Sequence, residues 1–403
     1  MGFRGMKMIQ PKKSEMSKHW RLNEKTVFLN HGSYGATPTI VLNEQKRWQL
    51  LLEKDPVKFF EDIAPKALIE SRKAIANLVN CDYEDLALIE NATSGVNIIL
   101  RSLEFEEGDE IIVPNHAYQA CRNTIDYVAE KWGAVVVTCE IPFPIQGNQI
   151  IIDNIMKCVT ENTKLAMIDT VTSPTGLLMP FEELVGLLES KGVNVLLDAA
   201  HGIGMIPLDI EKIGASYTTS NCHKWLCAPK GSAFLHVRKD LQSLIHPLTI
   251  SHGMTTPLGD STRFRHEFDW TGTRDVSAWC ALPFVIDEFS KLVGMNWNEI
   301  MTHNRKLVIK GRNIICEKLS IIPPCPENMI SSIATIKISS KQVSIRDLYE
   351  IDPLHVKLLD DYNIQVPVWS WPDPQGRYIR ISAQIYNNEN EYKYLADILE
   401  KCL

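Results

Sequence analysis

The middle of the chain alternates short apolar runs with stretches of helical periodicity. The apolar runs read LALIE, EIIVP, AVVVTC, KLAMIDT, VNVLLDA and SAFLHV, and they begin at positions 86, 110, 134, 164, 193 and 232. Between them, residues 95–102, 120–131 and 181–191 carry apolar side chains at helical spacing. Strands that are apolar on both faces, alternating with helices, are typical of a mostly parallel sheet covered on both sides. The sequence therefore predicts an α/β fold.

The pattern changes after about residue 282. Longer amphipathic helices follow, notably RKLVIKGRNIICEKL from Arg305, and then the strand-like pieces SSIATIKIS and YIRISAQIY. We expect a large α/β domain over residues 36–282 and a smaller α+β domain over residues 283–403, with residues 1–35 packing against the small domain. A chain of 403 residues is long enough for two such units.

Composition narrows the class of partner. The chain is 45% hydrophobic and 23% charged, which is typical of a globular protein, and its net charge is -7. No basic stripe is visible, so nucleic acid is not an expected partner. The sequence has no run of about 18 apolar residues, no recognisable signal peptide and no cysteine pairs at zinc-like spacing. We therefore expect a cytoplasmic protein with reduced thiols, no membrane span and no metal.

Polar residues follow several of the expected strands, where open α/β sheets bind their ligands. After the first run, NATSGVN offers a turn into a helix, where backbone N–H groups and the hydroxyls of Thr93 and Ser94 suit a phosphate. The same turn is also a good helix cap. NHAYQAC supplies the rings of His116 and Tyr118, and VTSPTG supplies the Ser173 hydroxyl. Either ring could equally be packed in the core.

A carboxylate and a lysine complete this set. Asp198 ends the apolar run VNVLLD, where an ionised acid needs a cationic partner. Lys224 follows 26 residues later (224 minus 198) in SNCHKWLCAPKG, beyond a strand-like SYTTS that would return the chain to the same edge. A phosphate-suited turn, an aromatic ring, a strand-end carboxylate and a lysine are what pyridoxal 5'-phosphate (PLP) requires. The lysine captures its aldehyde, and the carboxylate keeps its pyridine nitrogen protonated.

The chain resembles the class V aminotransferase family of fold-type I PLP enzymes, and within it the isopenicillin N epimerase-like and cysteine desulfhydrase-like group. The segments that carry the resemblance are, in chain order, FLNHGSYGATP, NATSGVN, HAYQA, TSPTG, DAAH, SNCHKW, WTGTRD and YIRISAQIYN. The resemblance implies a large PLP-binding domain with a mostly parallel sheet, a smaller α+β domain and a small amino-acid substrate. It also implies a homodimer with shared active sites.

The resemblance assigns roles around the cofactor ring. Lys224 is expected to form the Schiff base and then to act as acid and base at the substrate Cα, because desolvation lowers a lysine pKa. Asp198 would pair with the pyridine nitrogen, Ala200 would lie against one face of the ring, and His201 would lie near the ring hydroxyl. Tyr118 would cover the opposite face, with His116 as the close alternative. Ser173 would approach the ring hydroxyl, where related enzymes often carry asparagine.

The remaining roles concern the phosphate and the substrate. The phosphate group would be held by Thr93, Ser94, Asn221 and His223, and by Thr273 of WTGTRD reaching in from the neighbouring subunit. Arg380 in YIRIS would grip the substrate carboxylate, a task for a planar bidentate donor. Asn30 and His31 would line the substrate entrance, and Trp369 and Trp371 would either join them or pack in the core.

Three reactions share the loss of the Cα proton. Elimination of a β-sulfur group would make the protein a C–S lyase, reprotonation on the opposite face an epimerase, and reprotonation on the cofactor an aminotransferase. A lyase is the favoured hypothesis, because one lysine base can perform it. Two-base epimerisation needs a second proton donor, for which His31, His116 and Tyr118 are candidates.

Three other functions are less favoured. A cysteine desulfurase needs a nucleophilic cysteine on a small-residue loop, and Cys325, the only cysteine between Cys316 and Arg380, lacks that loop. A catalytically silent binding subunit would not need both Lys224 and Asp198. A nicotinamide-dependent dehydrogenase is suggested only by HGIGM, which lacks the third glycine and follows the wrong strand.

Overall fold

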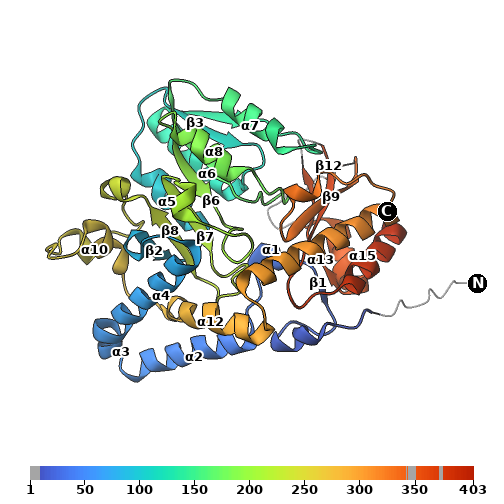
Figure 1. The fold of residues 1–403 in the computed structure, drawn as a ribbon, viewed down its shortest axis with the longest axis horizontal. Coiled ribbons are helices and arrows are strands. Elements are labelled where there is room, and N and C mark those ends of the chain that lie inside the picture. Colours follow the sequence, from blue (N-terminus) through green and yellow to red (C-terminus); the bar gives the residue numbers. More distant parts are fainter. Residues whose placement is uncertain (1–9, 342, 344–350, 372–374) are drawn as a thin grey trace, which may run out of the picture.

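The computed structural model describes residues 10–341, 343, 351–371 and 375–403. Its largest element is a seven-stranded sheet (Figure 1). The strands are β2 (Leu86–Ile89), β3 (Glu110–Pro114), β4 (Val135–Cys139), β5 (Thr163–Asp169), β6 (Asn194–Asp198), β7 (Tyr217–Asn221) and β8 (Ala233–Val237), in the spatial order β2-β8-β7-β6-β5-β3-β4. Neighbours from β7 to β4 are parallel, whereas β8 is antiparallel to both β2 and β7. The predicted mostly parallel α/β sheet is confirmed.

Most strands of the sheet are largely apolar because both faces of the sheet are covered, and β7 (YTTSN) is the polar exception. In β5, Leu165 and Met167 belong to one core and Ala166 and Ile168 to the other, as period-two alternation requires. The first core is closed by α5 (Ala92–Ser102), α6 (Gln119–Trp132) and α10 (Arg263–Asp269). The second is closed by α2 (Thr39–Lys54), α4 (Ala64–Val79), α7 (Asn148–Lys157), α8 (Phe181–Glu189), α9 (Ile210–Ile213), α11 (Ser277–Cys280) and α12 (Leu282–Val293).

The C-terminal part forms a separate layer around a three-stranded antiparallel sheet, ordered β11-β12-β9. Its strands and helices are β9 (Ile333–Ser339), β11 (Val368–Trp371), β12 (Gly376–Ser382), α13 (Trp297–Lys318), α14 (Pro353–Tyr362) and α15 (Glu389–Cys402). The long helix α13 begins at a capping box, in which Asn296 and Glu299 each accept the other's backbone N–H. The expected change to helices and a smaller sheet therefore occurs, while the exact domain bounds stay a prediction.

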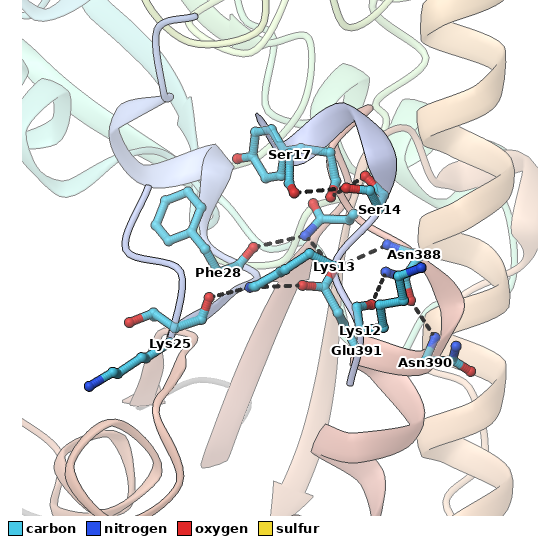
Figure 2. A network of polar contacts seen from close by, with 12 residues as sticks. Lys12, Lys13, Ser14, Ser17, Lys25, Phe28, Asn388, Asn390 and Glu391 are labelled. Carbon is cyan, nitrogen blue, oxygen red and sulfur yellow. Dashed lines mark hydrogen bonds and ion pairs between the residues drawn. The ribbon is translucent and has the colours of Figure 1, made fainter. Parts of the chain in front are cut away.

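The N-terminal segment is joined to the C-terminal elements by a short strand pair and by side chains. Strand β1 (Val27–Phe28) runs parallel to β10 (Ile364–Gln365). Figure 2 shows the polar contacts: the Lys13 ammonium lies 3.3 Å from the Glu391 carboxylate and also donates to the Thr26 carbonyl. Asn388, the N-cap of α15, donates to the Lys12 carbonyl at 2.9 Å. These contacts bring the segment that contains His31 alongside the C-terminal layer.

Across the described residues, no helix is both long and apolar enough to cross a membrane. Nor does that part of the chain bring three or more His, Cys, Asp or Glu side chains together as a metal site would need. The sequence predicts no signal peptide at the N-terminus, and residues 1–9 of that segment lie outside the described residues.

Candidate active site

A pocket of about 250 Å³ opens where the parallel strands β5, β6 and β7 end. Asp198 is the last residue of β6, and Asn221 is the last residue of β7. Residues far apart in the sequence meet here, as the topology of an open α/β sheet predicts. The sequence-predicted site residues that line the pocket are Thr93, Tyr118, Ser173, Asp198, Ala200, His201, Asn221, His223, Lys224 and Arg380.

Lys224 projects into the pocket from the loop after β7, where its Nζ lies 3.3 Å from His201 Nε2. Burial, with a further contribution from the Arg380 charge, lowers the pKa of Lys224 to about 8. The positive charge of a buried amine lacks hydration, so the free base gains relative to the ammonium. More of this amine is therefore unprotonated and nucleophilic near neutral pH than of an ordinary lysine.

The Asp198 carboxylate is held by two donors. Its Oδ1 accepts the Ala200 N–H at 2.9 Å, and its Oδ2 accepts the Cys121 thiol at 3.5 Å. Burial raises the pKa of Asp198, while the Ala200 N–H and the Lys224 charge act in the opposite direction. The carboxyl group is thus fixed in orientation and short of a cationic partner, which suits it to a protonated ring nitrogen.

Asp169 is a second buried acid in the same pocket, and sequence reasoning gave it no role. It ends β5, its Cα is paired in register with that of Asp198, and its Oδ2 is buried without a hydrogen-bond partner. Burial, followed by the Asp198 charge, raises the pKa of Asp169 well above its usual range. The signal was present in the sequence, because KLAMID and VNVLLD both end an apolar run on an aspartate.

The N-terminus of α5 reaches the pocket next to β7. Asn221 Oδ1 accepts the Ala92 N–H at 2.8 Å, and the N-cap residue Asn91 accepts the Ser94 N–H at 2.8 Å. A Cβ on Gly95 would lie 2.2 Å from Thr219 Oγ1, so the missing side chain lets the helix approach the strand closely. This close approach aims the positive end of the α5 dipole into the pocket.

His223 lies beside this helix terminus. Its Nδ1 is 2.9 Å from the Ser232 carbonyl, which can only accept, so Nδ1 carries a proton. Burial lowers the pKa of His223 to about 4 in the absence of an anion. Its Nε2 could donate only from the protonated ring, and a nearby phosphate dianion would favour that form.

Arg380 comes from β12 and closes the pocket from the C-terminal layer. Its guanidinium donates to the Ser173 carbonyl and to Ser173 Oγ at 3.2 Å, and also to Ser33 Oγ at 3.1 Å. Its Cζ lies 5.9 Å from the centre of the Trp369 ring. Burial lowers the pKa of Arg380 to about 10, so the side chain stays cationic at neutral pH. A fixed and charged guanidinium suits recognition of a carboxylate.

The structure separates the two candidate stacking rings. Tyr118 lines the pocket as the N-cap residue of α6, and it is 47% exposed. His116 is fully buried elsewhere, where its ring nitrogens contact Thr175 Oγ1 at 2.8 Å and the Ile141 carbonyl at 2.9 Å. It meets the edge of Trp371, with ring centres 4.6 Å apart. The alternative interpretation, core packing, therefore describes His116.

His31 and Asn30 do not line the pocket, although the sequence placed them at the substrate entrance. His31 is fully buried behind the lysine, with Nε2 2.9 Å from the Lys224 carbonyl and Nδ1 2.8 Å from the Tyr386 hydroxyl. Asn30 accepts the Ser33 hydroxyl at 2.6 Å. Instead, Gly32, Ser33 and Tyr34 contribute to the lining. The NHGSYG motif was found, but which of its residues face the pocket depends on packing against the C-terminal layer.

Two further predicted residues lie off the pocket of their own chain. Ser94 follows Thr93 in α5, and its N–H is taken by the Asn91 cap. Thr273 lines a different hollow, together with Gln49, Leu52, Glu53, Phe60, Arg274 and Asp275. The sequence predicted that Thr273 acts in a neighbouring subunit, which is a different pocket from the one formed here.

The residues present fit PLP. One face of the pocket offers a nucleophilic amine at Lys224, its floor offers the fixed carboxylate of Asp198, and the N-terminus of α5 offers free positive dipole for a phosphate. The Asp169 oxygen without a partner shows that the floor is built for polar rather than apolar contents. An amine, a carboxylate and an anion site at the ends of adjacent strands are the donor set that this cofactor needs.

Comparisons with known proteins agree with this fit. A sequence model of the Aminotransferase class-V family matches residues 58–395. Putative L-cysteine desulfhydrase 1 of Oryza sativa subsp. japonica is 31% identical over 406 residues, which cover 93% of this chain and 82% of that protein. Isopenicillin N epimerase of Streptomyces clavuligerus is 27% identical over 391 residues, covering 94% and 95% respectively.

A solved structure extends the likeness to the fold. A C-DES mutant with glycine covalently linked to its PLP cofactor superimposes with a TM-score of 0.78, over 97% of this chain and 99% of that chain, at 17% identity. The fold-type I prediction and the PLP prediction are confirmed. The chain therefore belongs to the class V aminotransferase family of PLP-dependent enzymes.

Proposed function

We propose that this enzyme is a C–S lyase, which removes the Cα proton of a small sulfur-containing amino acid and expels its β-sulfur group. With L-cysteine and water, the products after hydrolysis would be pyruvate, ammonia and sulfide. The relatives named L-cysteine desulfhydrase support this choice of substrate class. Ten free cysteines support a reducing, cytoplasmic setting, although one relative is named as chloroplastic.

Each proposed residue has one task. When bound, PLP draws electrons away from the Cα of an attached amino acid and so makes its proton acidic. Lys224 Nζ takes that proton, for which a pKa of about 8 is well matched to neutral pH. Arg380 binds the substrate carboxylate, and Asp198 faces the ring nitrogen. Tyr118 is proposed to cover the ring opposite Ala200.

The proposed phosphate site joins two subunits. Thr93, Asn221 and His223 would hold the phosphate from within the chain. Thr273 would reach it from the partner of a homodimer. Ser94 would contribute only through the helix that it belongs to, because its N–H is already bonded to Asn91.

One observation carries the preference for a lyase over an epimerase. Two of the three candidate second bases, His31 and His116, are buried with both ring nitrogens in contact with other polar groups. Tyr118 is thus the one member of those three candidates that lines the pocket together with Lys224, and elimination by Lys224 needs no second base. Epimerisation is the second candidate, because Tyr118 lines the pocket and isopenicillin N epimerases are among the relatives.

The thiols favour elimination of free sulfide over attack of a protein thiolate on the sulfur of the substrate. Cys121 is the cysteine that lines the pocket, but it donates to Asp198, and burial raises its pKa far above neutrality. Cys325 is buried, and burial raises the pKa of its thiol to about 11. Neither thiol is a reactive thiolate, which a sulfur acceptor would need to be.

The test is a panel of L-amino acids given to the PLP-loaded enzyme in deuterated water. The panel contains L-cysteine, L-cystine, an S-alkyl-L-cysteine, L-serine and L-alanine, and Lys224→Ala serves as the control. Pyruvate together with an equal amount of the expelled sulfur product would support the lyase: sulfide from L-cysteine, a persulfide from L-cystine or the alkyl thiol from the S-alkyl-L-cysteine. Deuterium at Cα with inversion would identify an epimerase, and conversion of the cofactor to its amine form would identify an aminotransferase. Either of these outcomes without pyruvate and an expelled sulfur product from any β-sulfur substrate would overturn the proposal.

A further inference from the structure

A tryptophan next to the proposed catalytic lysine hydrogen-bonds to the pocket histidine. Trp225 follows Lys224 in the sequence, and its indole Nε1 donates to His201 Nδ1 at 3.0 Å. Trp225 is fully buried and His201 is 2% exposed, so water does not replace this bond. The centres of the two rings are 6.3 Å apart.

This bond decides where His201 can carry its proton. An indole N–H can only donate, so the nitrogen that it faces must present a lone pair. His201 Nδ1 is therefore bare, and the neutral ring carries its proton on Nε2. A protonated ring would set two donors against each other in a site closed to water, where an unsatisfied donor is costly.

The proton on Nε2 in turn acts on the lysine. His201 Nε2 lies 3.3 Å from Lys224 Nζ. An ammonium has three donors and no acceptor, whereas a neutral amine has a lone pair that can accept the Nε2–H. We infer that Trp225 fixes His201 as its neutral Nε2–H tautomer, and that His201 thereby favours the free amine of Lys224 over its ammonium form. Trp225 is then a positioning residue that keeps the lysine ready to bind the cofactor and to take up a proton.

The surrounding charges also favour the neutral form of His201. Lys224, Arg380 and His31 all disfavour a positive charge on His201, in addition to its burial. On Lys224 they are mixed: Arg380 favours the free amine, while Asp198 favours the ammonium. The direction of the His201 hydrogen bond therefore adds to the effect of Arg380 and opposes that of Asp198. The role given to Lys224 rests on the proposed function, but the tautomer of His201 does not.

The first experiment reads the tautomer directly. The full-length protein is labelled with ¹⁵N-histidine, and side-chain nitrogen shifts are recorded between about pH 6 and 9, with and without PLP. His201→Gln assigns the signal by its loss. We expect His201 to show a protonated Nε2 and a bare Nδ1 over the whole range. A proton on Nδ1, or an imidazolium that forms within this range, would overturn the inference.

The second experiment measures the effect on the lysine. The rate at which the cofactor-free protein captures PLP is followed against pH, because only the free amine reacts. Trp225→Phe should raise the apparent pKa of Lys224 by about one unit, since the freed ring can turn its bare nitrogen to the ammonium. Trp297→Phe is the matched control, because that buried indole donates to the Ile286 carbonyl at 3.1 Å, away from the pocket. An unchanged pKa in a folded Trp225→Phe protein would refute the inference.

Two substitutions of His201 test whether its hydrogen bonds, rather than its ability to ionise, control the pKa of Lys224. In His201→Gln, the amide oxygen can accept from Trp225 and the amide nitrogen can donate to Lys224, so the pKa of the lysine should stay near that of the wild type. In His201→Leu it should move in the direction of the Trp225→Phe change. If the enzyme makes no sulfide but these shifts occur, the proposed reaction fails and the inference stands. If sulfide forms but His201 carries its proton on Nδ1, the proposed reaction stands and the inference fails.

Discussion

Asp169 and Asp198 end neighbouring parallel strands in register, and their side chains lie on the face of the sheet covered by α6. Two adjacent buried carboxylates cannot both ionise cheaply. Asp198 has the Ala200 N–H, the Cys121 thiol and the nearby lysine charge, whereas Asp169 has an oxygen without a partner. Asp169 is therefore the member of the pair that keeps a proton.

The first prediction concerns stability against pH. Because the pKa of folded Asp169 is raised above its ordinary 3.8, the wild type loses stability as the pH rises from that value towards the folded pKa. Asp169→Asn cannot ionise and escapes this loss. The melting temperature of the cofactor-free Asp169→Asn protein should therefore rise relative to that of the wild type as the pH increases above about 4.

Asp209→Asn is the control for this measurement. The Asp209 carboxylate is exposed, and the Lys212 N–H lowers its pKa, so it stabilises the fold once ionised. Because that contribution is complete above the unfolded pKa of 3.8, the melting temperature of Asp209→Asn should fall behind that of the wild type only as the pH rises to about 5, and the difference should stay constant above it. A gain for Asp169→Asn that does not depend on pH would mean that Asp169 is not the protonated acid.

The second prediction concerns the covalent anchor. Lys224→Ala should lose the borohydride-trapped link to PLP, and turnover should fall by at least about 10³-fold, because both the nucleophile and the base are removed. Lys230→Ala, six positions further on and exposed, should keep the link. Peptide mapping after borohydride reduction decides the point. A label on any other lysine in the wild type would refute the assignment.

The third prediction concerns the substrate carboxylate. Arg380→Lys keeps the charge but loses the planar pair of donors, so kcat/KM for the amino acid should fall about 10²-fold, mainly through KM. The affinity for PLP should not change. Arg377→Lys is the matched control on the same strand, because Arg377 binds Asp352 rather than the pocket. Equal losses in both variants would point to damage to β12 instead of a lost carboxylate contact.

The sequence allowed prediction of the site residues that lie at the ends of the strands. Asp198 and Lys224 could be placed because Asp198 ends an apolar strand, Lys224 follows the strand-like SYTTS, and parallel strands end at the same edge of a sheet. Asp169 satisfied the same rule and could have been found by it. Cys121 could have been found from helical spacing, since Cys121, Ile125 and Val128 lie on the α6 face that packs against the sheet.

The same rule could not show which histidines face the pocket. Whether His31 or His116 faces the pocket depends on contacts with Tyr386 and Ile141, which are far away in the sequence. An imidazole that is buried with both ring nitrogens in hydrogen-bond contact leaves no recognisable pattern in the neighbouring sequence. For the same reason the sequence could not show that the segment around His31 lies behind the lysine, between two layers of the fold.

The fourth prediction tests whether two chains build one site. Thr273 lies in a hollow apart from the pocket that holds Lys224, and we propose that it serves the partner of a homodimer. Thr273→Asp should weaken PLP binding by charge repulsion, and Lys224→Ala should be inactive. In a mixed dimer of these two variants, the one pocket with an intact lysine also receives an intact threonine. Unfolding and refolding the two variants together should therefore restore about a quarter of the wild-type sites, if pairing is random. No recovery in mixtures that contain mixed dimers by mass would place Thr273 outside the partner's site.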